Sequence, residues 1–137
     1  MDTAKSTAIV FGIVFVLIGI LGFIPNPIVG PESLIVTNAA HNIVHLLIGG
    51  YLLFAGYSTH AASVTALFVT GGIYLLLAIV GFLLIGTVGE AMMFGFVHFN
   101  AAGNWFHLIV ALVLLAAAFA TRPVRTGPRT PRTLEAR

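Results

Sequence analysis

Four long apolar runs make up most of the chain, at residues 6–24, 39–57, 64–85 and 99–120. A helix that crosses a bilayer needs about 20 mainly apolar residues, so each run is long enough to span a membrane. None of the runs contains Asp, Glu, Lys or Arg. Because the connector at residues 58–62 is very short, the second and third runs must be antiparallel neighbours. The pattern predicts an all-α integral membrane four-helix bundle, in one domain over residues 1–121.

The second and fourth runs open with nearly the same polar pattern. It consists of Asn38, His41, Asn42 and His45 in the first copy, and of Asn100, Gly103, Asn104 and His107 in the second. The first and third runs also align, through small residues at Gly12, Gly19 and Gly22 and at Gly71, Ala78 and Gly81. The chain is therefore predicted to be two tandem helical hairpins, related by a parallel pseudo-two-fold axis along the membrane normal. Since the first run is the partner of the third, we expect it to be a retained span and not a cleaved signal peptide.

Each polar pattern continues along its helix as a stripe of small residues. At about 100° per residue, the polar face of the second run also carries Gly49 and Gly56, and the fourth run has Ala111 and Ala118 at the equivalent positions. Polar side chains in a membrane usually face protein, and small residues let helices approach closely. We therefore expect the second and fourth spans to face each other across the pseudo-axis, with the first and third packed outside them.

Composition identifies the solvent and excludes several kinds of site. Hydrophobic residues make up 59% of the chain, charged residues make up 7%, and the mean hydropathy is +1.09. Soluble domains carry about 25% charged residues, so lipid must cover much of this chain. The absence of cysteine excludes disulfides and thiolate-ligated metal sites.

The placement of charge predicts the orientation in the membrane. Residues 122–137 form an arginine- and proline-rich segment, which we expect to be disordered and cytoplasmic because cytoplasmic flanks carry the excess of Lys and Arg. Four spans then bring both termini to the cytoplasmic side, and the Asn/His pattern lies near the outer leaflet. The connector at 86–98 is expected to be interfacial or re-entrant. His60, in the short inner turn, is expected to be a solvated loop residue.

One interpretation of the repeated polar pattern is structural. Asn and His side chains form hydrogen bonds between membrane helices, worth about 0.6–2 kcal/mol each, and so fix the register of packed spans. Asn38 and Asn100 stand where helices begin, and Asn is a favoured N-cap. In this interpretation the cluster holds the two halves of the bundle together.

The alternative interpretation is ligand binding. His45 and His107 occupy equivalent positions, so they lie at one depth, as the two axial imidazoles of haem b require. Imidazole also suits several transition metals, and a metal site would have His45 and His107 joined by other polar groups. The candidates for that role are His41, His98, Glu90 and Glu32.

The residues that carry the polar pattern also indicate a family. The segment at residues 38–50, followed by a second Asn-x-x-His-Leu at residues 104–108, resembles the four-span bacterial membrane proteins of domain-of-unknown-function family 4383. The resemblance covers about residues 6–120. It implies a four-helix bacterial membrane protein with no assigned activity, and it carries over no catalytic residue and no cofactor. We expect such a protein in the inner membrane.

The sequence favours a role without catalysis. Membrane enzymes usually carry carboxylates, a Ser/His pair or a metal within their spans, and the four runs contain no carboxylate. We predict a non-enzymatic structural or accessory membrane protein with no cofactor. Its expected partners are the lipid bilayer and either further copies of itself or other membrane subunits, and no nucleic acid.

Overall fold

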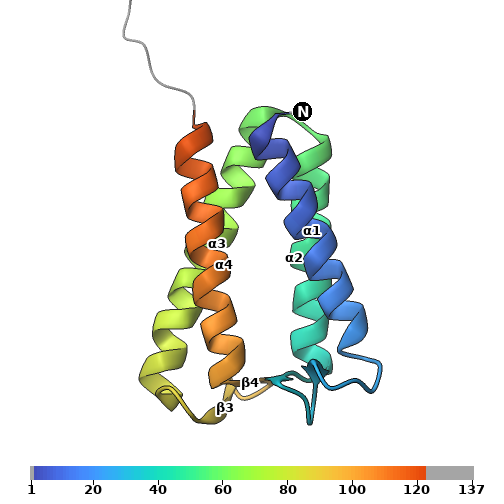
Figure 1. The fold of residues 1–137 in the computed structure, drawn as a ribbon, viewed down its shortest axis with the longest axis vertical. Helices are drawn as coiled ribbons and strands as arrows, with labels where there is room; N and C mark the ends of the chain where they lie inside the picture. Colours follow the sequence, from blue (N-terminus) through green and yellow to red (C-terminus); the bar gives the residue numbers. More distant parts are fainter. Residues whose placement is uncertain (1, 123–137) are drawn as a thin grey trace, which may run out of the picture.

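The computed structural model describes residues 2–122 and contains four long helices and four short strands within that range (Figure 1). The helices are α1 (Thr3–Leu21), α2 (Ala39–Tyr57), α3 (His60–Ile85) and α4 (Ala101–Thr121). The strands are β1 (Val29–Gly30), β2 (Ile35–Val36), β3 (Glu90–Met93) and β4 (Val97–Asn100). All four helices are long and apolar enough to cross a membrane. The prediction of an all-α, four-span fold is confirmed, and the chain is a multi-pass membrane protein.

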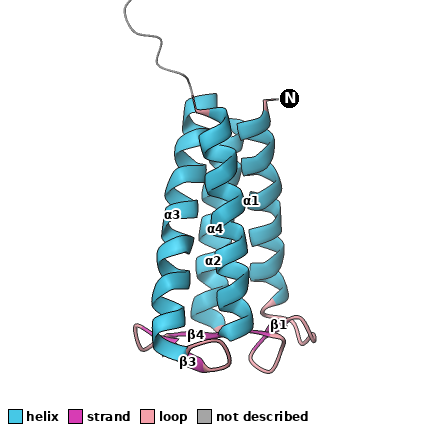
Figure 2. Ribbon diagram, turned by 60° about the vertical axis from the view of Figure 1, so that its left-hand side comes forward, coloured by secondary structure: helices cyan, strands magenta, loops and turns pink. Residues whose placement is uncertain are grey.

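The helices alternate in direction, so the termini and the connecting strands lie at opposite ends of the bundle. The N-terminus and the end of α4 lie at one end, and all four strands lie at the other (Figures 1 and 2). The helices pair as the hairpins α1–α2 and α3–α4, which start at the same end. We refer to the end with the strands as the strand end. Apart from Arg122, the predicted arginine-rich tail lies outside the described residues.

Polar N-caps decide where the helices begin. The side-chain oxygens of Asp2, Asn38, Thr59 and Asn100 each accept a hydrogen bond from a backbone N–H in the first turn of their helix. The caps at Asp2 and Thr59 start α1 and α3 a few residues before the apolar runs at 6–24 and 64–85, whereas α4 starts later than the run at 99–120 because β4 takes up its first residues.

The small residues lie between the helices of one hairpin. A Cβ atom added to Gly12 would lie 3.0 Å from the backbone oxygen of Gly49, and one added to Gly49 would lie 2.9 Å from that of Gly12. Gly71 is equally close to α4, where the backbone nitrogen of Leu115 would be 3.2 Å from an added Cβ. The expectation that the small stripe of the second span packs against the fourth span is therefore wrong. Glycines on both α1 and α2 let these two backbones meet, whereas histidine rings fill the space between α2 and α4.

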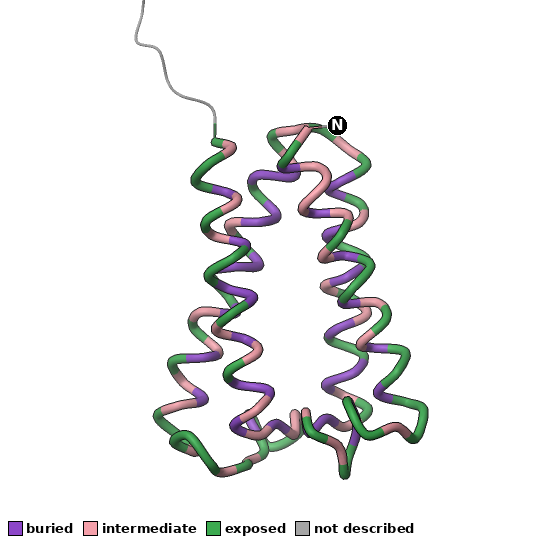
Figure 3. Tube along the Cα trace, viewed as in Figure 1, coloured by how far each residue is buried: buried purple, intermediate pink, exposed green. Residues whose placement is uncertain are grey.

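The remaining packing positions belong to the same two seams. They are Gly19, Gly22 and Gly56 in the first hairpin and Ala78, Gly81, Ala111 and Ala118 in the second, and all seven are buried. Outside the seams, large apolar residues are exposed, with Leu47, Phe54 and Leu83 at 68%, 74% and 81%. Figure 3 shows buried and exposed positions alternating along every helix. Such an apolar exterior suits a surface that faces lipid.

Short strands cover the strand end of the bundle. The connector at 86–98, expected to be interfacial or re-entrant, leads into an antiparallel hairpin of β3 and β4. Its turn contains Phe94 and Gly95, with φ values of 53° and 79°, a conformation that glycine adopts easily and phenylalanine rarely. The first connector pairs β1 with β2 in parallel.

Candidate functional site

The two N-cap asparagines at the strand end tie the hairpins together reciprocally. The Nδ2 group of Asn38 donates to the backbone oxygen of Phe96 at 2.7 Å, and that of Asn100 donates to the backbone oxygen of Leu34 at 2.9 Å. Leu34 lies four residues before Asn38, as Phe96 lies four residues before Asn100. The N-cap asparagine of each hairpin therefore donates to the connector of the other hairpin, so the two hydrogen bonds are related by the same two-fold symmetry as the repeat.

The second asparagine of each pattern faces its own hairpin. A Cβ atom on Gly22 would overlap the side-chain amide of Asn42, and one on Gly81 would overlap that of Asn104. Asn104 donates from Nδ2 to the backbone oxygen of Ala78 at 3.1 Å. Both amides are buried, at 1% and 0% exposure. Asn104 thus bonds α4 to α3 and Asn42 packs against Gly22 at the end of α1, although the Oδ1 atoms of both amides have no partner among the described residues.

Three histidines meet between the hairpins. His41 and His45 of α2 and His107 of α4 are buried, and each offers a ring nitrogen that lies within 4.8 Å of the other two. The ring centroid of His41 lies 4.5 Å from that of His45 and 5.8 Å from that of His107. We call these three residues the histidine cluster.

Two aromatic rings lie beside the histidine cluster. Phe15 of α1 is 5.7 Å from the ring of His45, Tyr74 of α3 is 5.0 Å from the ring of His107, and the two aromatics are 5.1 Å apart. Phe15 and Tyr74 are buried and occupy equivalent positions in the repeat. Every helix of the bundle thus contributes a ring to this region.

The backbone of β4 orients one histidine. The Nδ1 atom of His41 lies 2.7 Å from the backbone oxygen of His98. Because a carbonyl oxygen only accepts, Nδ1 must carry the proton and donate it, and the lone pair of the neutral ring is then on Nε2. A backbone group that sequence patterns do not reveal therefore selects the tautomer of His41.

The other two rings hold unsatisfied polar atoms. Within residues 2–122, both ring nitrogens of His45 and Nδ1 of His107 are buried without a hydrogen-bond partner. An unpaired buried polar group costs about 1–3 kcal/mol, and most such groups have a partner in native proteins. The rings border an apolar cavity of about 210 Å³, whose lining also includes Met93, Phe96 and Phe99.

The other residues considered for a metal site lie apart from the histidine cluster. The ring of His98 points to Glu90, with Nε2 at 3.8 Å from the carboxylate, and only its backbone reaches His41. Glu32 borders a different cavity, beside Gly22 and Asn42. The sequence pattern does not show where the side chains of these connector residues point, because their directions depend on the strand pairing.

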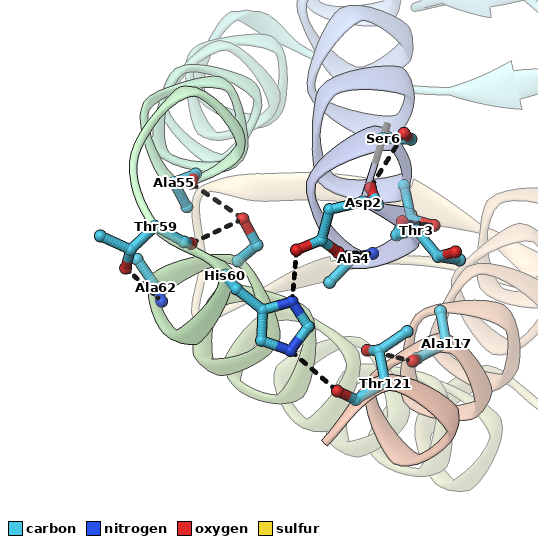
Figure 4. Close-up of polar contacts among 12 residues, drawn as sticks. Asp2, Thr3, Ala4, Ser6, Ala55, Thr59, His60, Ala62, Ala117 and Thr121 are labelled. Atoms are coloured by element: carbon cyan, nitrogen blue, oxygen red, sulfur yellow. Dashed lines mark hydrogen bonds and ion pairs between the residues drawn. The ribbon is translucent and has the colours of Figure 1, made fainter. Parts of the chain in front are cut away.

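A second polar contact joins three helices at the opposite end of the bundle. Nδ1 of His60 lies 2.5 Å from a carboxylate oxygen of Asp2, and its Nε2 lies 2.9 Å from the backbone oxygen of Thr121 (Figure 4). Both ring nitrogens face acceptors, so the protonated ring satisfies both. Although desolvation raises the pKa of Asp2, hydrogen bonds from His60 and from the Ala4 N–H hold that pKa below its usual value of 3.8. The expectation that His60 is simply solvated is therefore wrong.

Comparisons with known proteins give a family and no further relative. Neither the curated proteins nor the solved structures yield a match. The family model described as Domain of unknown function (DUF4383) matches residues 5–120, which include α2, α3, nearly all of α1 and α4, and both polar patterns. The resemblance seen in the sequence is confirmed, and the chain belongs to the DUF4383 family.

Proposed function

We propose that this protein is a non-enzymatic structural or accessory component of the bacterial inner membrane, acting as a homo-oligomer or as a subunit of a larger membrane complex. The observation that carries the proposal is the use of its interior polar groups. The four Asn side chains of the repeat cap helices, bind the connector of the other hairpin or pack against glycines.

The outer surface supports lateral association. Gly50 of α2 and Gly72 of α3 are exposed, and a Cβ atom added to either would meet nothing within 4 Å. Small residues on a lipid-facing surface let a helix of another chain approach closely, which is the main source of attraction between helices in a membrane. Both glycines are unused by the fold itself, so they are suited to contacts between chains.

Native mass spectrometry of protein extracted in mild detergent tests this proposal. We expect a particle that contains more than one 14.4 kDa chain, or one chain together with another membrane subunit. Gly50→Leu and Gly72→Leu should weaken the assembly without unfolding the chain. A monomer without partners at every detergent concentration would overturn the proposal.

A further inference from the structure

We propose that the histidine cluster, His41, His45 and His107, binds one monovalent copper ion. The inference goes beyond the structural role above, because that role uses the asparagine amides and gives no partner to the unpaired nitrogens of His45 and His107. It rests on four features of the cluster: the convergence of the three rings, the orientation of His41, the unpaired nitrogens, and the lack of charge around them.

The spacing of the rings suits an ion. Metal–imidazole bonds measure about 2.0–2.1 Å, so two nitrogens on one metal are at most about 4 Å apart. The three nitrogens of the cluster lie within 4.8 Å of one another. Small side-chain movements, on the order of 1 Å, therefore bring all three into bonding distance. The adjoining cavity of about 210 Å³ is smaller than the roughly 300–1,000 Å³ of typical small-molecule sites, which favours an ion over a macrocycle such as haem.

His41 is oriented as metal ligands usually are. A histidine that binds a metal through one nitrogen commonly donates its other N–H to a carbonyl or carboxylate, which fixes the ring and its tautomer. The bond from Nδ1 of His41 to the backbone oxygen of His98 has this form and leaves Nε2 to bind. The connector of the second hairpin thus supports a ligand carried by the first.

The unpaired nitrogens point to an occupant. His45 is 2% exposed and lacks a partner at both ring nitrogens, and His107 is 5% exposed and lacks one at Nδ1, among the residues the structure describes. Apolar side chains would fill this part of the bundle at lower cost than unpaired imidazoles. A bound cation supplies a partner for one nitrogen of each ring at once.

Charge selects the ion. Imidazole binds zinc, nickel, iron and copper, but the cost of burying an ion rises with the square of its charge. None of the residues that line the cavity is acidic, so no carboxylate at this site would offset the charge of a divalent ion. Copper(I) carries a single charge, and the thioether of Met93, which lines the same cavity, is a soft ligand of the kind it prefers.

The unequal halves of the repeat give one site per chain. Gly103 occupies the position in α4 that His41 occupies in α2, so the third imidazole comes from the first hairpin alone. The ion would lie on the side of α2, with His45 and His107 as the symmetric pair. A two-site or perfectly symmetric arrangement would need a fourth histidine at Gly103.

Competition with a colorimetric copper(I) chelator tests the proposal on purified protein in detergent under reducing conditions. We expect one copper(I) per chain and a rise in thermal stability on loading. His45→Gln and His107→Gln should each weaken binding by at least about 100-fold, since each removes a direct ligand. X-ray absorption of the loaded wild-type protein should show a first shell of imidazole nitrogens.

His98→Gln is the matched control. It changes a histidine close to the cluster but keeps the backbone oxygen that orients His41, so copper affinity should stay within a few-fold of wild type. The proposal would be overturned if the protein bound no copper, or if it bound zinc more tightly than copper(I). It would also be overturned if His98→Gln and His45→Gln lost the same amount of copper(I) affinity. If the glutamine variants do not fold, the X-ray absorption spectrum of the copper-loaded wild-type protein decides the question. A spectrum that shows no imidazole ligands on the copper would overturn the proposal.

Discussion

At the scale of single residues, the bundle depends on glycine and asparagine pairs within each hairpin. Gly22 faces Asn42 and Gly81 faces Asn104, at equivalent places in the two repeats. In each pair the glycine leaves room for a buried amide that a longer side chain would displace. The pairing explains why the asparagines and glycines recur together in both halves.

Gly81→Ala is expected to destabilise the protein. The added methyl group overlaps the amide of Asn104, which is fully buried and bonded to Ala78 and so has no free space to move into. Overpacking of this kind costs about 1–3 kcal/mol. Unfolding in mixed detergent micelles measures the loss. Gly72→Ala in the same helix meets open space and is the matched control; a loss as large as that of Gly81→Ala would contradict the packing argument.

Asp2→Asn tests the contact between Asp2, His60 and Thr121. Asparagine still caps α1 but loses the charge that His60 binds, so thermal stability at neutral pH should fall slightly. The pKa of Asp2 is lowered in the folded protein, so its contribution is present above 3.8 and is lost as the pH falls through the folded value. The difference in melting temperature between Asp2→Asn and wild type should therefore shrink as the pH falls below 3.8, and also at alkaline pH, where His60 no longer carries a charge. A difference that is independent of pH would show that the charge is not involved.

The sequence predicted which residues form the interior polar groups but not their individual contacts. The repeat placed His45 and His107 at one level, and the structure brings their rings to a common cavity. It did not reveal what orients the ring of His41, since that partner is a backbone oxygen in β4. The Asp2–His60 contact could not be predicted either, because it joins groups from separate helices.

At the scale of elements, the helices follow from local pattern and the strands from tertiary contacts. Long apolar runs specify helices in lipid, because a helix satisfies all its own backbone groups. The strands contain only two to four residues each, too few for a reliable periodic signal. Asn100 of β4 holds β2 in place, because its Oδ1 accepts from the N–H of Val36 and its Nδ2 donates to the oxygen of Leu34.

Asn100→Ala should weaken both the start of α4 and the link to the first connector. It removes the cap on the N–H of Gly103 together with the two bonds to β2 and its neighbour, and we expect a loss of about 1–3 kcal/mol in the free energy of unfolding. Asn100→Asp keeps the acceptor oxygen and loses only the donor, so its loss should be smaller. Unfolding followed by circular dichroism distinguishes the two. Equal losses would show that the acceptor bonds contribute little.

At the scale of the molecule, the topology follows from the number of spans. Both ends of the described chain lie at one end of the bundle and the strands lie at the other. We infer from the arginines of residues 122–137 that the helix ends near Thr121 face the cytoplasm. The position of both ends at one side of the bundle was predictable from the sequence, since it depends on counting apolar runs, whereas the orientation across the membrane stays a prediction. The packing of α2 against α1, and not against α4, was not predictable, because a helical stripe does not identify which neighbour it meets.

Labelling of single cysteines tests the orientation, because the natural chain has no cysteine. Phe94→Cys, at the strand end, should react with a membrane-impermeant maleimide added to cells whose outer membrane is permeable. Ser58→Cys, in the turn at the opposite end, should react only after the inner membrane is opened. The reverse pattern would place the histidine cluster on the cytoplasmic side.

The crossed bonds of Asn38 and Asn100 have a consequence for the integrity of the bundle. Each hairpin is completed by a carbonyl that the other one presents, in the way that two subunits of a symmetric dimer complete each other. The peptide link between Ser58 and Thr59 is therefore not what keeps the halves aligned. A protein cut there keeps the non-covalent contacts that align the two halves, so its two fragments should reassociate in the bilayer.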